Sequence, residues 1–142
     1  MRLLQSNVLL LLAGLIGIVG AAIAEESRAT GDARWYLAAD VERGGEVYAA
    51  HCAVCHGVRA QGAVVGSLTA PPLNGGGHSA HHGLDYLVEQ VTNGGAPKGG
   101  KMPAFAAVLA ESDRRAAIAW IQHLWPDATY RDWQQMHSFG PH

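Results

Sequence analysis

Residues 51–57 read H-C-A-V-C-H-G and contain both cysteines of the chain. Two thiols at this spacing, followed directly by a histidine, could form a disulfide, bind a metal or attach a larger group. A structural zinc site needs four ligands, and without a second C-x-x-C pair distant histidines would have to complete it. A thioredoxin-like dithiol expects a βαβ setting, which the sequence lacks. A simple disulfide leaves His56 unexplained.

The pattern Cys52-x-x-Cys55-His56 is the attachment signature of c-type haem. Thiols one helical turn apart can add to the two vinyl groups on one edge of a porphyrin, and the histidine that follows can coordinate the iron. We therefore expect one haem c, bound covalently through Cys52 and Cys55, with His56 as the proximal iron ligand.

The ligand on the opposite side of the iron separates electron transfer from ligand binding. Of the three methionines, Met102 lies in the segment K-M-P-A-F, directly before Pro103. Methionine usually fills hydrophobic cores, but no periodic apolar face surrounds this one. A soft thioether held by a proline-stiffened loop suits iron. Met102 is therefore the expected distal ligand.

Three helices are expected to position these residues, and we find no convincing strand pattern. The first covers residues 40–51 with Asp40 as N-cap. Its pair Gly44-Gly45 is costly within a helix, which indicates that something large packs on the backbone there. The others are expected at residues 84–91 and 111–125. The segments between them are rich in glycine and proline, so the fold class is all-α with long loops that wrap something.

Residues 1–24 have a short basic start, an apolar middle and a small-residue ending, which are features of an export signal. The alternative is an uncleaved membrane anchor, since the apolar run is at the lower length limit for a span. Both predict a periplasmic protein, and an oxidising compartment agrees with haem attachment. The net charge of −2, without a basic cluster, argues against nucleic-acid binding.

The stretch G-G-E-V-Y-A-A-H-C-A-V-C-H-G resembles the N-terminal helix and attachment site of monohaem class I cytochromes c, small bacterial c-type cytochromes among them. The segments P-P-L-N-G, K-M-P-A-F and A-A-I-A-W-I-Q-H-L-W are similar to later landmarks of that family, in the same order. The resemblance implies the class I cytochrome c fold, with three to five short helices and loops wrapped around one haem. The expected divisions are a signal peptide or anchor (1–24), an N-terminal extension (25–39), a cytochrome c domain (40–126) and a C-terminal tail (127–142) without an assigned function.

The resemblance also implies roles for single residues. Gly44 and Tyr48 would meet Trp120 where the first and last helices of the domain cross, and Tyr48 would contribute to cofactor binding. The Pro71 carbonyl would accept the Nδ1–H of His56, which leaves Nε2 of that ring for the iron.

These features predict an electron carrier rather than an enzyme, because protein ligands on both sides of the iron leave no position for a substrate. Donor and acceptor redox proteins would dock transiently at the haem edge. Lys98 and Lys101 are candidates for steering an acidic partner. Membrane contact is expected only if the N-terminal segment is uncleaved.

Two alternative functions stay open. One is a haem-based gas-binding or sensing protein in which Met102 is labile. The other is the electron-entry cytochrome subunit of a larger oxidase or dehydrogenase complex.

The cluster His78, His81 and His82 in G-G-G-H-S-A-H-H-G suggests a second metal site for copper or zinc, or a contact with the haem propionates. The simpler interpretation is a solvated polar loop.

Overall fold

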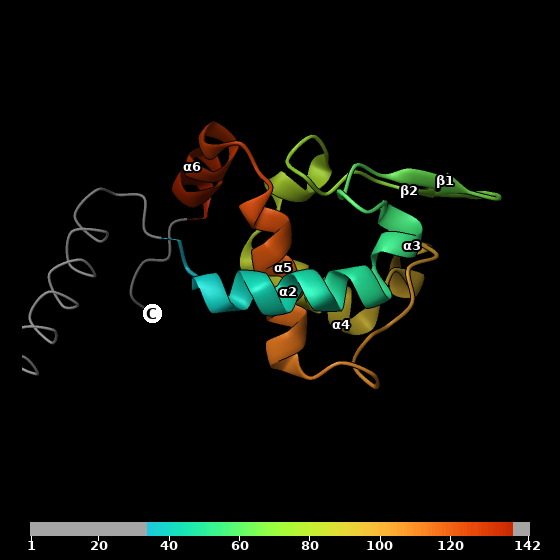
Figure 1. Cartoon of the computed structure of the whole chain (residues 1–142). Helices are drawn as coiled ribbons and strands as arrows, with labels where there is room; N and C mark the ends of the chain where they lie inside the picture. Colours follow the sequence, from blue (N-terminus) through green and yellow to red (C-terminus); the bar gives the residue numbers. More distant parts are fainter. Residues whose placement is uncertain (1–33, 138–142) are drawn as a thin grey trace, which may run out of the picture. The chain divides into compact units, whose positions relative to one another are not determined.

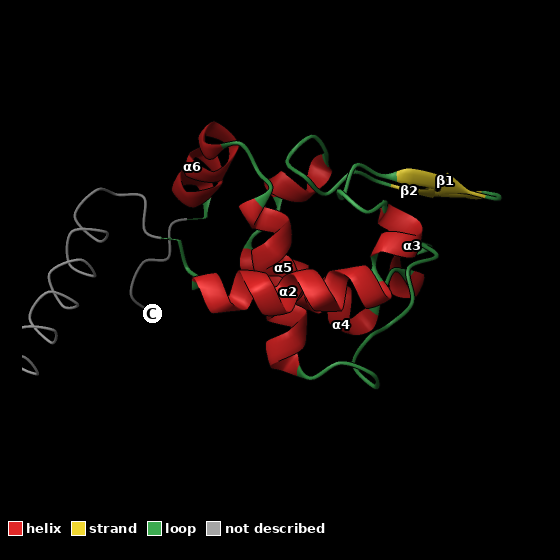
Figure 2. Ribbon diagram, in the orientation of Figure 1, coloured by secondary structure: helices red, strands yellow, loops and turns green. Residues whose placement is uncertain are grey.

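A computed structural model describes residues 34–137 of the chain, which are mostly helical, and so the all-α expectation is confirmed (Figures 1 and 2). The helices are α2 (Ala38–His51), α3 (Ala53–His56), α4 (Leu84–Asn93), α5 (Glu111–His123) and α6 (Asp127–Met136). Two 3₁₀ turns, η1 (His78–His81) and η2 (Ala96–Lys98), lie in the connecting segments. The expected signal or anchor at 1–24, and most of the extension, lie outside the described residues.

The crossing of α2 over α5 is the main helix contact of the fold, and Figure 1 shows the two helices at a steep angle. A Cβ added to Gly44 would overlap the Ala116 carbonyl and lie 2.9 Å from Trp120 Cβ. The rings of Tyr48 and Trp120 lie 4.3 Å apart between centroids. The expected packing of Gly44 and Tyr48 on Trp120 is therefore confirmed.

The first helix begins earlier than expected. Its N-cap is Leu37 rather than Asp40, which is the third residue of the helix. The Asp40 carboxylate accepts the backbone N–H of Leu37 at 2.8 Å. The carboxylate thus satisfies an amide at the helix start from inside the first turn, which extends α2 toward the N-terminus.

The later helices begin where the sequence predicts but end at different residues. Helix α4 begins at Leu84 as predicted and continues to Asn93, where Gly94 takes a positive φ of 71°. Helix α5 begins at Glu111 as predicted but ends at His123. Pro126 then serves as the N-cap of α6, a helix that was not predicted.

A β-hairpin lies where only turns were expected. Strands β1 (Ala63–Val65) and β2 (Leu68–Ala70) pair antiparallel, with Val65 opposite Leu68, and appear in yellow in Figure 2. The hairpin extends beside α3 (Figure 1). Gly66, with a positive φ of 61°, provides the tight turn. Strands of three residues are too short to give a recognisable alternating pattern.

Two groups of buried side chains stabilise this arrangement. One contains Val47, Phe105, Leu109 and Ala117, with Met102 and Val91 packed against it. The other is aromatic and contains Trp125, Tyr130 and Trp133 from the α5–α6 region. Within residues 34–137, none of the helices has the length and apolar character needed to cross a membrane.

The close approach at Gly44 predicts that Gly44→Ala destabilises the fold by about 2 kcal/mol or more, because the added methyl would force α2 away from α5. Gly45→Ala is the matched control, since its methyl would meet only the Trp120 ring, at 3.1 Å. The gain in helix propensity offsets that contact, so its effect should stay below about 1 kcal/mol. Urea unfolding of both variants measures the difference. Equal losses would contradict the packing described.

Candidate functional site

The two cysteines and His56 lie on one helical turn. Cys52 ends α2, and its carbonyl accepts the backbone N–H groups of Cys55 at 3.1 Å and His56 at 2.9 Å. The two cysteines form no disulfide with each other, and both are half-buried. Burial, followed by the charge of Cys55, raises the pKa of Cys52 to about 11.

The imidazole of His56 is oriented by the backbone. Its Nδ1 lies 2.9 Å from the Pro71 carbonyl oxygen. A carbonyl can only accept a hydrogen bond, so Nδ1 is the donor in this contact and Nε2 is the ring nitrogen left available to bind a metal. His56 thus has the tautomer that a metal-ligating histidine needs, with a backbone partner of the kind that supports such ligands.

A folded-back loop brings Pro71 to His56. Ala60, fully buried and in a left-handed conformation with φ of 54°, reverses the chain. Its carbonyl accepts the backbone N–H groups of Leu73 at 2.7 Å and Asn74 at 3.2 Å. The N–H of Gly62 returns to the His56 carbonyl at 2.8 Å. These bonds place the start of the P-P-L-N-G segment directly beside α3.

Tyr48 fixes the other side of the same turn. Its hydroxyl donates to the carbonyl of Gly57, the residue after His56, at 2.8 Å. Burial is the main cause that raises the pKa of Tyr48 to about 12, so the phenol stays protonated and can donate. Tyr48 therefore links the α2–α5 crossing to the turn that carries His56.

Met102 is half-buried on the loop between α4 and α5. Its carbonyl accepts the N–H of Gly95 at 2.8 Å, which closes the loop on itself. Its sulfur lies 3.9 Å from Nε2 of Gln90 on α4, a contact that the sequence alone did not reveal. Met102 also packs against the cluster around Val47, so the core-filling role set aside earlier has a structural basis.

The segment with Met102 lies close to the attachment motif. His51, which directly precedes Cys52, makes an edge-to-face contact with Phe105, with ring centroids 6.3 Å apart. Phe105 follows Met102 by three residues, and its N–H donates to Val91 of α4 at 3.1 Å. The end of α2, α4 and the methionine loop therefore converge in one region of the molecule.

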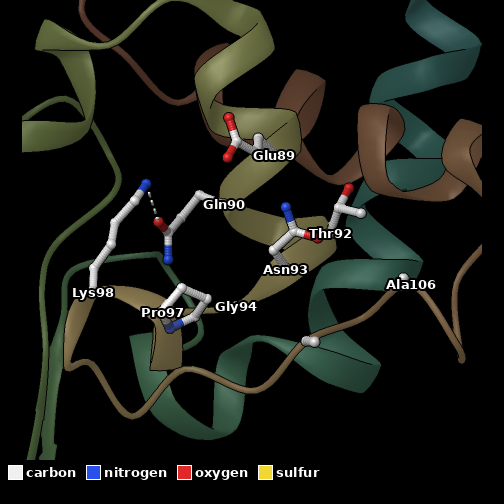
Figure 3. A pocket seen from close by; sticks show the side chains of 9 residues that line it. Glu89, Gln90, Thr92, Asn93, Gly94, Pro97, Lys98 and Ala106 are labelled. Carbon is white, nitrogen blue, oxygen red and sulfur yellow. Dashed lines mark hydrogen bonds between the residues drawn. The ribbon is translucent and has the colours of Figure 1, made fainter.

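A pocket of about 360 Å³ lies between α4 and the loop that contains Met102 (Figure 3). It includes neither the cysteines nor His56, so it is distinct from the attachment motif. Figure 3 shows Lys98 directed toward Gln90, and the Nζ to Oε1 distance is 3.3 Å. Lys98 also lies 4.0 Å above the Tyr86 ring, so this lysine is engaged within the protein.

The histidine cluster does not form a metal site in this structure. His78 lies 4.8 Å from His82 and 5.2 Å from His81 between ring centroids. His82 stacks on Tyr86 at 4.0 Å instead of converging with the others. In the part of the chain that is described, no group of three histidine, cysteine or acidic side chains could hold a metal ion. The hypothesis of a second metal at these residues is therefore not supported.

Several apolar side chains of the attachment motif and the segment after it are exposed to solvent. Val54, Val58 and Val64 are largely exposed. Between Glu46 and Asp85 the sequence has a single charged residue, Arg59.

Comparisons with known proteins agree with this geometry. The family described as "Cytochrome C oxidase, cbb3-type, subunit III" matches residues 39–121. The "Cbb3-type cytochrome c oxidase subunit CcoP" of Azospirillum brasilense is 37% identical over 89 residues, which cover 61% of this chain and 29% of that protein. A "Cytochrome c-553-like" protein of Synechocystis is 35% identical over 69 residues, which cover 49% of this chain and 56% of that protein.

The chain spans 29% of the length of the Azospirillum relative, so only part of that protein has a counterpart here. No solved structure matches the chain. The matched residues 39–121 include the attachment motif, Pro71 and Met102, whereas Trp125 and α6 lie beyond them.

The surroundings of His82 predict a pH-dependent stability. Burial, and then the neighbouring charges of His78, Lys98, His81 and His137, lower the pKa of His82 from its ordinary value of 6.5. The folded chain therefore binds this proton less readily than the unfolded chain. Stability should fall as the pH drops through 6.5 toward the lowered pKa.

Thermal unfolding between pH 7.5 and 5.5 checks this, with the pH range set around the ordinary histidine pKa of about 6.5. His82→Gln should reduce the decrease in Tm across the range, whereas His123→Gln, at an exposed position on α5, should leave it unchanged. If Tm of His82→Gln decreases as much as that of the unmodified chain, His82 is not the source of the pH dependence.

Proposed function

Since the chain belongs to the class I c-type cytochromes, within the family of cbb3-type oxidase subunit III, we propose that it transfers single electrons between redox proteins through one covalently bound haem. The observation that carries the proposal is the geometry of His56. Its ring follows directly after two thiols on one turn and is held through Nδ1 by a backbone carbonyl.

The donor set fits a haem c. Cys52 and Cys55 would form the two thioether links, His56 would bind the iron through Nε2, and Met102 would bind it from the opposite side. When bound, the haem supplies a one-electron iron couple, whose reduction potential His/Met ligation raises. The Gln90 amide, close to the Met102 sulfur, would hold that side chain in orientation.

The same ligand set supports a carrier rather than an enzyme, because both axial positions would be filled by the protein. We propose that redox partners dock transiently around the attachment motif, where Val54 and Val58 are exposed. Lys98 and Lys101 are the candidates for steering an acidic partner, and Lys98 keeps its positive charge although it contacts the neutral Gln90 amide and the Tyr86 ring.

A second candidate function is that of an electron-entry subunit in an oxidase complex. The similarity to a protein named as a cbb3-type oxidase subunit favours it. Native gel electrophoresis of solubilised membranes separates the two proposals. A stable subunit should migrate with a haem oxidase, whereas an independent carrier should be recovered alone.

Methionine ligation predicts a specific effect of Met102→Ala. The ferric variant should become high-spin and its ferrous form should bind carbon monoxide readily, because one axial position is opened. Absorption spectra with and without carbon monoxide measure both effects. Met136→Ala, at a position 57% exposed on α6, is the control and should behave like the unmodified chain. Carbon monoxide binding by the unmodified chain, at the rate of the variant, would instead favour the gas-binding alternative.

Export is part of the proposal, with residues 1–24 as a signal peptide and the cytochrome domain at 40–126 in the periplasm. The mature protein from the periplasmic fraction should then begin at Glu25, as determined by N-terminal sequencing. A chain that still begins at Met1 and sediments with membranes would show an uncleaved anchor.

A further inference from the structure

Two buried tryptophans hold the two ends of the segment 73–82. Trp125, 3% exposed, donates its indole N–H to the Leu73 carbonyl at 2.7 Å. Trp133 of α6, fully buried, donates to the His82 carbonyl, also at 2.7 Å. The two indoles contact each other edge-to-face, with centroids 6.0 Å apart. The segment between Leu73 and His82 is therefore fixed to the C-terminal part of the chain at both ends.

The first of these bonds lies close to the support of His56. Leu73 is bonded on both sides, because its carbonyl accepts from Trp125 and its N–H donates to the Ala60 carbonyl at 2.7 Å. Pro71, two residues earlier, provides the carbonyl that binds His56 Nδ1 at 2.9 Å. A continuous set of short contacts thus leads from Trp125 through Leu73 and Pro71 to the imidazole.

The backbone packs tightly where this segment meets the α5–α6 junction. A Cβ added to Gly75 would lie 2.9 Å from Pro126 Cδ and 3.4 Å from Trp125 Cα. The segment therefore has little room to shift without displacing Trp125. Because Trp133 packs on Trp125, α6 restricts the movement of the Trp125 ring from the other side.

We propose that Trp125 is a positioning residue for His56, acting through Leu73 and Pro71, and that α6 holds Trp125 in place through Trp133. This inference rests on the proposed function, in which His56 binds the haem iron. Both tryptophans lie beyond the residues 39–121 that match the family, so this support of His56 comes from the C-terminal part of the chain. It gives a role to the tail, for which the sequence suggested none.

The physical consequence concerns the basicity of the proximal ligand. Donation from Nδ1–H to a carbonyl makes the imidazole a stronger base at Nε2. A stronger base stabilises ferric iron more than ferrous iron, so a firmly held Pro71 carbonyl lowers the reduction potential. Loss of the Trp125 hydrogen bond should loosen Pro71, weaken the bond to His56 and raise the potential.

The test compares Trp125→Phe with Trp133→Phe in the full-length haem-loaded protein. Each variant removes one indole N–H from a buried bond of the same length, so both should lower Tm by similar amounts. In Trp125→Phe, hydrogen exchange of His56 Nδ1–H, measured by NMR in the ferrous state, should become at least about tenfold faster relative to buried amides of α5. The equilibrium for reduction should shift two- to fivefold, about 20 to 40 mV upward for a one-electron couple. Trp133→Phe loses the N–H bond to His82 but keeps an aromatic ring against Trp125, so it should change both quantities less than about twofold.

Two results would overturn the proposal. Equal losses of Tm with unchanged His56 exchange and potential in Trp125→Phe would make Trp125 a purely structural residue. Equal shifts in both variants would show a general loosening of the segment. If Trp125→Phe does not fold, 3-benzothienylalanine at position 125 keeps the ring volume but lacks the N–H, and the same outcomes apply. Haem binding by the unmodified protein is measured first. A protein that binds no haem would contradict the proposed function, and this result is distinct from the outcomes that contradict the role of Trp125.

Discussion

The hydrogen bond between His56 Nδ1 and the Pro71 carbonyl is the interaction on which the candidate site depends. It decides which ring nitrogen is free, and it joins two segments separated by fifteen residues. To make it, the chain must reverse at Ala60 in a left-handed conformation, at a cost of about 1–2 kcal/mol for a residue with a side chain. The backbone bonds from Leu73 and Asn74 to the Ala60 carbonyl offset that cost. A strained position is thus retained next to the residue that it serves, as is common at functional sites.

The helix crossing supplies the frame for that bond. Gly44 allows α2 to approach the backbone of α5, and the Tyr48 ring then lies on Trp120. From this position the Tyr48 hydroxyl reaches the Gly57 carbonyl and holds the turn that follows His56. The same two helices contribute Val47 and Ala117 to the cluster against which Met102 packs. The contact between α2 and α5 therefore positions both proposed axial ligands. Trp125 and Trp133, from the region of α6, hold the segment that follows Pro71.

The parts of this arrangement that local spacing determines were predictable from the sequence. The cysteines and His56 fall on one turn because of their separation, and the glycine at position 44 indicated close packing. The hairpin at 63–70 escaped prediction because each strand has only three residues and both carry exposed valine or leucine. Helix α6 escaped it because the tail is largely polar, although Pro126-Asp127 and the spacing of Tyr130 and Trp133 were a usable signal. The contact of Gln90 with Met102 is tertiary, and no local pattern encodes it.

The central claim is that Met102 and His56 face each other across one covalently attached haem. NMR of the reduced, unmodified protein with labelled methionine methyl groups tests it most directly. A methyl group bound to haem iron lies over the porphyrin ring, so its resonance is shifted far upfield by the ring current. We predict one such resonance, from Met102, while the Met136 methyl stays at its ordinary position. A reduced protein that contains haem but shows every methionine methyl at an ordinary position would contradict the claim.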